Sequence, residues 1–187
     1  MAEASQTTRD GIVAAAGELF YAGSIRDISV DRIAAQAGVT KKTVYYHFRS
    51  KDELVAAYLD ARNRPTLERY RRWAGKGGSM ADRIERMFRS LQKAAKSHEW
   101  NGCGFTRVAV ELADLPGHPA LDVARNHKRG FEGWLRQDLA DSGYEDAGEL
   151  SEMLMIILDG AITRMLVHRD PHYAAVAARA ARRLLSR

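Results

Sequence analysis

The stretch that decides the fold of this chain is Gly38-Val39-Thr40-Lys41-Lys42-Thr43-Val44-Tyr45-Tyr46-His47-Phe48. Its second half could form a strand, because β-branched and aromatic residues are frequent there. Its first half favours a helix, since Gly38 suits a turn with positive φ and Thr40 can accept a backbone hydrogen bond at a helix start. On a helix, Val44 and Phe48 lie four residues apart on one face. We therefore predict a helix that packs through a narrow apolar edge.

The opposite face of this predicted helix is polar and basic. Lys42, Tyr45, Tyr46 and Arg49 point broadly that way, and residues 41–50 include no acidic side chain. Positive charge combined with hydroxyls and aromatic rings suits contacts to phosphates and bases. The pattern indicates a nucleic-acid-binding face.

Two further helices are predicted before this stretch. Apolar residues at helical spacing indicate a first helix that begins at a capping box, Thr7 to Asp10, and ends near Tyr21. Ser29 can cap a short second helix whose apolar and alanine residues share one face. Residues 29–48 are therefore predicted to form a helix-turn-helix.

A long helix is predicted to follow, started by a second capping box from Ser50 to Glu53 and kinked or broken at Pro65. The Gly-rich segment 75–79 is the clearest flexible break. Beyond it, helical spacing separated by Gly, Pro and Asp predicts about five more helices. No alternating strand pattern and no internal repeat occur, so we expect an all-α chain with about nine helices.

The composition is that of a globular protein, with 187 residues, 45% of them hydrophobic and 28% charged. No apolar run approaches the roughly 18 residues of a membrane helix, and no signal-peptide pattern is evident at the N-terminus. We therefore expect a cytoplasmic protein that does not bind membranes. Cys103 is the only cysteine, which excludes an intrachain disulfide and a multi-cysteine metal site. A small core residue is its expected role, rather than a redox sensor.

Positive charge is distributed unevenly along the chain, whose formal net charge is +5. Residues 1–60 contain seven basic and eight acidic residues, whereas residues 61–76 contain six basic and one acidic residue. DNA binding by the N-terminal part would therefore depend on a few local cations: Lys41, Lys42, Arg49 and Lys51. The basic segment 61–76 can be either a solvated helix face or a second phosphate-binding surface.

The helix predicted over 150–168 is apolar around most of its circumference, although a surface helix needs only one apolar stripe. It can bury its second face in its own domain or against another subunit. The last predicted helix is rich in small residues, which permit close packing. We favour a homodimer interface made by both helices, with contacts from Met153, Ile157, Ala161, Met165, Tyr173, Val176, Ala180 and Leu184.

Together these features resemble the TetR family of transcription regulators. The resemblance runs from Ile12 to about Leu59, roughly a quarter of the chain, and includes Thr43-Val44-Tyr45-Tyr46-His47-Phe48 and Ser50-Lys51-Asp52-Glu53-Leu54. Gly102-Cys103 followed by Phe105 is similar to an element of one group of such regulators. Ser24 is a departure, because many members have Gly after the first helix. The rest of the chain is similar only in the number and order of its helices.

The resemblance implies a helix-turn-helix DNA-binding domain over 1–50, a linking helix over 51–76 and a ligand-binding and dimerisation domain over 77–187. It also implies a homodimer that places two recognition helices in successive major grooves of double-stranded operator DNA, roughly 34–36 Å apart. We expect a repressor that a small-molecule effector releases from its operator. The alternatives are an activator or a constitutive DNA-binding protein of the same fold.

The resemblance and the side-chain chemistry predict the residues at the DNA. Lys42, Thr43 and Tyr45 suit base edges, and Lys41, Tyr46, His47 and Lys51 suit phosphates. Lys51 also matches the family's phosphate-contacting lysine, at a helix start whose free N–H groups attract anions. The full predicted set is Ser29, Thr40, Lys41, Lys42, Thr43, Tyr45, Tyr46, His47 and Lys51.

An effector pocket is expected among the helices that follow, although each of its candidate residues can equally be a packing or surface residue. These candidates are Phe88, Trp100, Phe105, Arg107, His127, Phe131 and Trp134. An enzyme in a helical bundle is the remaining alternative. The sequence has no Glu-x-x-His pair, Gly-rich phosphate loop or serine elbow, so we expect no catalytic residue, metal site or cofactor.

Overall fold

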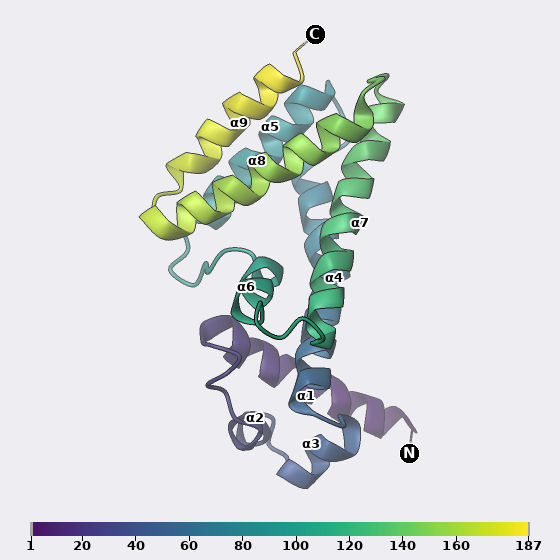
Figure 1. Cartoon of the computed structure of the whole chain (residues 1–187), viewed down its shortest axis with the longest axis vertical. Coiled ribbons are helices and arrows are strands. Elements are labelled where there is room, and N and C mark those ends of the chain that lie inside the picture. The colour runs from purple at the N-terminus through teal and green to yellow at the C-terminus, as the bar shows by residue number, and fades with distance from the viewer. Residues whose placement is uncertain (1, 187) are drawn as a thin grey trace. The chain divides into compact units, whose positions relative to one another are not determined.

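The all-α prediction is confirmed. The computed structural model describes residues 2–186, and over that range it contains nine α-helices and no strand (Figure 1). The helices are α1 (Ala2–Ala22), α2 (Val30–Gln36), α3 (Lys41–His47), α4 (Lys51–Ala74), α5 (Met80–Ala94), α6 (Gly104–Glu111), α7 (Pro119–Asp141), α8 (Ala147–His168) and α9 (His172–Leu184). Among the described residues, no helix is both long and apolar enough to cross a membrane.

Three helix starts have the predicted caps. The hydroxyls of Ser29, Thr40 and Ser50 each accept a hydrogen bond from the backbone N–H three residues later, over 3.1–3.2 Å. Gly38 adopts a φ of 66°, which the turn between α2 and α3 requires and which glycine permits without strain. The Glu53 carboxylate accepts the backbone N–H of Arg49 over 2.7 Å, one residue before the N–H of Ser50 that the predicted capping box would use. Local sequence therefore determines the helix-turn-helix boundaries.

The predicted start of the first helix is wrong, because α1 begins at Ala2 and Thr7 lies inside it. The preceding residues include Ala, Glu and Gln, which are strong helix formers. The carboxylate of Asp10 also accepts a hydrogen bond from Gln6 Nε2 over 3.0 Å, four residues away on the same helix face. Asp10 thus supports the helix interior rather than a cap.

Of the kink or break predicted at Pro65, the break is wrong, since the 24-residue helix α4 runs through this proline, and the kink stays a prediction. A proline inside a helix removes one backbone N–H and crowds the carbonyl four residues earlier, here that of Ala61. Both Ala61 and Pro65 are exposed, so water can satisfy that carbonyl. Solvent thus reduces the disruption that the proline causes.

The helices pack as two compact units that do not follow the chain linearly. The first unit joins the residues up to 64 with residues 104–127, and the second joins 65–103 with the residues from 128 onward. The division falls inside α4 and inside α7. It differs from the linear boundaries predicted at 50 and 76, because α6 and the start of α7 pack with the N-terminal helices. The functional division of the chain stays a prediction.

In the first unit, apolar side chains from α1 to α4 form the core. Ile12 and Phe20 of α1, Ile33 of α2 and Leu54 of α4 are buried there. Phe20 also contacts the ring of Tyr58, with 5.6 Å between ring centroids. The recognition segment is therefore packed with three other helices of this unit.

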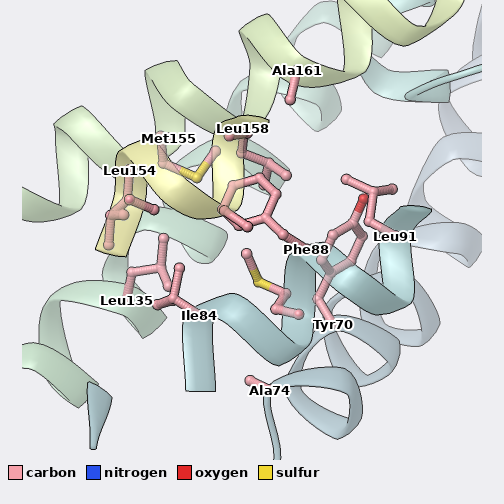
Figure 2. Packing of buried hydrophobic residues seen from close by; sticks show 14 of the residues in the cluster. Tyr70, Ala74, Ile84, Phe88, Leu91, Leu135, Leu154, Met155, Leu158 and Ala161 are labelled. Atoms are coloured by element: carbon pink, nitrogen blue, oxygen red, sulfur yellow. The ribbon is translucent and has the colours of Figure 1, made fainter. Parts of the chain in front are cut away.

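In the second unit, α5 supplies Ile84, Phe88 and Leu91 to a core that α8 covers with Leu154 and Leu158 (Figure 2). Helix α9 lies alongside α5 and α8 (Figure 1). Its small residues Ala174, Ala177, Ala178 and Ala181 are buried, which lets the helices approach closely. Cys103 is only partly buried against this core.

Candidate nucleic-acid interface

Helix α3 packs through the narrow apolar edge predicted for it. Val44 and Phe48 are each only 1% exposed. On the other side, Tyr45 is 47% and Tyr46 80% exposed, and Lys42 is exposed as well. Large exposed aromatic side chains beside a lysine are unusual on a surface without a binding role. The division into a buried packing face and an exposed polar face is therefore confirmed, and its contact with DNA stays a prediction.

Thr40 and Thr43 act together at the start of α3. Thr40 Oγ1 accepts the Thr43 backbone N–H over 3.1 Å, and the two hydroxyl oxygens are also hydrogen-bonded, 2.8 Å apart. This arrangement fixes both side chains at the end of α3 that leaves the turn. At the opposite end, the rings of Tyr46 and His47 meet edge to face, with centroids 5.1 Å apart.

Lys41 is already paired with an acidic side chain from the neighbouring helix. Its Nζ donates to Asp31 Oδ2 of α2 over 2.8 Å, and both side chains are largely exposed. The hydrogen bond to Asp31 and its negative charge raise the pKa of Lys41. Asp31 lies ten positions before Lys41, outside the acid-free stretch 41–50, so the sequence pattern does not reveal this pairing. Lys41 must therefore exchange one anion for another to contact a phosphate.

Ser29 and Arg49 lie at the two ends of the helix-turn-helix. Ser29 is exposed and its hydroxyl caps α2, so its demonstrated role is structural. Arg49 is exposed, and its backbone N–H is the group that Glu53 caps. Its side chain adds positive charge between α3 and α4.

Lys51 sits at the first position of α4 and points toward the α1–α2 loop. Its Nζ donates to the carbonyl oxygen of Arg26 over 3.2 Å. Burial lowers the pKa of Lys51, while the nearby charges of Asp52, Glu111 and Asp27 oppose this change. The ammonium is therefore partly desolvated, next to the free N–H groups at the start of α4.

Similarity to known proteins agrees with this geometry. The family described as "Bacterial regulatory proteins, tetR family" matches residues 12–58, which run from α1 into α4. The probable HTH-type transcriptional regulator ArpR of Pseudomonas putida is 42% identical over 178 residues, which cover 90% of this chain and 84% of ArpR. This chain belongs to the TetR family. It is thus a DNA-binding transcriptional regulator with a helix-turn-helix.

Two further comparisons differ in extent. The HTH-type transcriptional regulator SrpR of Pseudomonas putida is 43% identical over 61 residues, which span only 33% of this chain and 29% of SrpR. The crystal structure of a putative TetR transcriptional regulator from Streptomyces avermitilis is 29% identical, with a TM-score of 0.81, and the match covers 93% of this chain and 97% of that one. The fold similarity therefore extends over nearly the whole chain.

The residues predicted for an effector pocket divide between the two units of this TetR-family chain. In the second unit, Phe88 and Phe131 are core residues, the rings of Phe131 and Trp134 lie 5.2 Å apart, and Trp100 is partly buried against the same core. In the first unit, Phe105 stacks on the buried His127 with 3.6 Å between ring centroids. Their role toward an effector stays a prediction.

Two predicted pocket residues have structural partners in the first unit. His127 Nδ1 is hydrogen-bonded to Asn63 Oδ1 of α4 over 2.8 Å. Arg107 donates to the carbonyl oxygens of Tyr21 and Gly23 over 2.9 and 3.3 Å, so its guanidinium holds the end of α1. These contacts join residues 64 to 86 positions apart, which sequence spacing does not reveal.

The residues predicted for a dimer interface differ in burial. Ala161 and Met165 are buried within their own protomer, so their side chains serve its core. The others have accessible surface: Met153, Ile157, Tyr173, Val176, Ala180 and Leu184. Helix α8 additionally exposes Ile156 at 72% and Val167 at 69%, and neither residue was in the predicted set. No cluster of three or more potential metal ligands occurs among residues 2–186.

Proposed function

We propose that this regulator is a repressor that binds a double-stranded operator as a homodimer and leaves it when a small-molecule effector binds. The observation that carries the DNA-reading part is the exposed face of α3. Lys42 and Tyr45 project from a helix whose opposite side is anchored by Val44 and Phe48. A short helix fixed in this way can enter a major groove without losing its shape.

The division of DNA contacts proposed from the sequence fits the positions of the side chains. Lys42, Thr43 and Tyr45 are proposed to read base edges, through donors or through apolar contact with thymine methyl groups. Tyr46, His47 and Lys51, together with Lys41 once it leaves Asp31, are proposed to contact phosphates. The phosphate contacts would thus set the position of the protein, and the base contacts the sequence that it selects.

Exposed apolar side chains on α8 and α9 support the homodimer. Ile156, Val167 and Val176 present apolar surface on helices whose other faces are already buried in the core. Exposed apolar side chains on two helices that pack together favour a protein–protein contact there. A twofold dimer would present two copies of α3 to two half-sites, as a palindromic operator requires.

The proposed effector acts through differential binding to two states of the protein. A ligand that binds the non-operator state more tightly lowers operator affinity, and operator DNA must then weaken ligand binding by the same factor. The continuous helix α4 belongs to both units and connects Lys51 to the core around Tyr70. We propose it as the element that transmits the change.

A selection experiment tests the DNA-binding proposal. The purified full chain is used to enrich duplexes from a random pool, and the affinity of the enriched duplex is measured by fluorescence anisotropy between about 50 and 200 mM salt. We expect sequence-selective binding that weakens steeply with salt, because phosphate contacts release counterions. Lys42→Ala should weaken it, whereas Lys96→Ala, an exposed lysine on the other unit, should not. Failure to enrich any sequence would contradict the proposal.

A ligand-released repressor differs from an activator or a constitutive DNA-binding protein in how its operator affinity responds to a ligand. Adding small-molecule fractions from the source cell to the protein–duplex complex should lower its anisotropy if an effector is present. A complex whose affinity is independent of every ligand that binds the protein would favour a constitutive DNA-binding role.

A further inference from the structure

The loop between α1 and α2 is tied to the end of α6 by the carboxylate of Glu111. Ser24 Oγ donates to Glu111 Oε1 over 2.6 Å, and the backbone N–H of Arg26 donates to the same oxygen over 3.0 Å. Ser24 Oγ also accepts the Arg26 backbone N–H over 3.1 Å. A glycine at position 24 would lack the hydroxyl that makes two of these three hydrogen bonds. All three residues belong to the first unit, although the sequence separates Glu111 from the other two by 85 to 87 positions.

The side chain of Arg26 strengthens the same junction. Its Nε and one terminal guanidinium nitrogen donate to the main-chain carbonyl of Glu111 over 3.2 and 3.0 Å, and the guanidinium also pairs with Asp114. Hydrogen bonds in which a partner is charged are the stronger ones in proteins. The end of α6 therefore binds the backbone and the side chain of one loop residue at once.

This junction leads directly to the lysine proposed to contact phosphate. The carbonyl oxygen of Arg26 accepts the hydrogen bond from Lys51 Nζ, over 3.2 Å. The N–H of Arg26 is held by Glu111, and its C=O holds Lys51, so a single loop residue connects the two. The negative charge of Glu111 also opposes the lowering of the Lys51 pKa that burial causes.

We infer that Glu111 is a positioning residue for operator binding, acting through Ser24 and Arg26 to hold the carbonyl that orients Lys51. The inference rests on the proposed DNA-binding function and extends it to α6, which lies outside the helix-turn-helix. Any displacement of the end of α6 would then change the position of the Lys51 ammonium at the DNA.

If Glu111 acted only through its charge, its removal would have the opposite effect on DNA binding. A carboxylate near Lys51 would repel a DNA phosphate, so removing it without any positioning role would tighten binding. Glu111→Gln keeps the acceptor oxygen for Ser24 and Arg26 but removes the charge, whereas Glu111→Ala removes both. Comparing these two variants separates geometry from charge.

The experiment is a double-mutant cycle on the duplex enriched from a random pool by the unmodified protein. We expect Glu111→Ala to weaken binding about tenfold, and Glu111→Gln to stay within about twofold of the unmodified protein. In a Lys51→Ala background, Glu111→Ala should add less than about twofold, because its effect passes through Lys51. Val110→Ala, the exposed neighbour on α6, serves as the control.

The outcomes distinguish a positioning role of Glu111 from an effect of its charge alone. Equal loss from Glu111→Ala with and without Lys51, or tighter binding by either Glu111 variant, would overturn the inference. If Glu111→Ala does not fold by circular dichroism, Ser24→Ala replaces it in the same cycle, with an expected loss of about threefold that vanishes in the Lys51→Ala background. If the unmodified protein enriches no duplex, the proposed DNA-binding function is contradicted, and the inference about Glu111 falls with it. Binding that all Glu111 variants leave unchanged contradicts the inference alone.

Discussion

Replacing Asp31 with asparagine should strengthen DNA binding and make it more sensitive to salt. Asp31 Oδ2 accepts the hydrogen bond from Lys41 Nζ over 2.8 Å, and its charge favours the protonated lysine. The asparagine side chain would keep a hydrogen-bond acceptor but remove the anion that competes with phosphate for Lys41. The lysine would then be available to the DNA without first breaking an ion pair.

The expected change in salt dependence follows from the number of phosphates neutralised. Each additional phosphate contact steepens the plot of log affinity against log salt concentration by about 0.9 for duplex DNA. A homodimer contributes two copies of Lys41, so Asp31→Asn should steepen the slope by about 1.8. Between about 50 and 200 mM salt, this corresponds to about a twelvefold larger loss of affinity than in the unmodified protein.

The assay is fluorescence anisotropy with the enriched duplex and with a scrambled duplex of the same composition. Asp60→Asn, which changes an exposed acid on α4 instead, serves as the matched control. Tighter binding to both duplexes is expected at low salt, since a phosphate contact does not depend on sequence. An unchanged slope, or weaker binding by Asp31→Asn, would refute this reasoning.

Three further predictions concern phosphate contact, packing and assembly. Lys51→Ala should weaken binding to every duplex alike and reduce the salt slope by about one for each protomer; a loss confined to one sequence would exclude a phosphate role. Phe48→Ala should lower the free energy of unfolding by about 3–5 kcal/mol in urea titrations, because Phe48 is fully buried and Arg9 lies over its ring. Ile156→Glu should shift sedimentation toward the monomer, whereas Val110→Glu, equally exposed on α6, should not. A dimer that tolerates Ile156→Glu would place the interface elsewhere.

Sequence predicted the helix-turn-helix because its determinants are local. The caps at Ser29 and Thr40 and the positive φ of Gly38 each depend on residues close by in the chain. The alternation between Val44, Phe48 and the exposed tyrosines is likewise a property of a single helix. Such features survive in any surroundings that leave the helix intact.

The features that sequence missed depend on contacts between distant segments. Asp31 neutralises Lys41 because α2 and α3 pack together, and Glu111 reaches Ser24 across 87 positions. Helix α4 continues through Pro65 where both Ala61 and Pro65 are exposed, and this exposure follows from tertiary packing rather than from the local sequence. Packing thus decides where charges are compensated, and residue types alone do not.

The most direct test of the central claim is the ratio of affinities for the enriched and the scrambled duplex. A specific regulator should bind its own site about a thousandfold or more tightly at physiological salt. Lys42→Ala, Thr43→Ala and Tyr45→Ala should each reduce this ratio, by about fivefold or more for a true base contact. Lys51→Ala should weaken both affinities and leave the ratio unchanged. If the three α3 variants preserve the ratio, the exposed face of α3 does not read the operator.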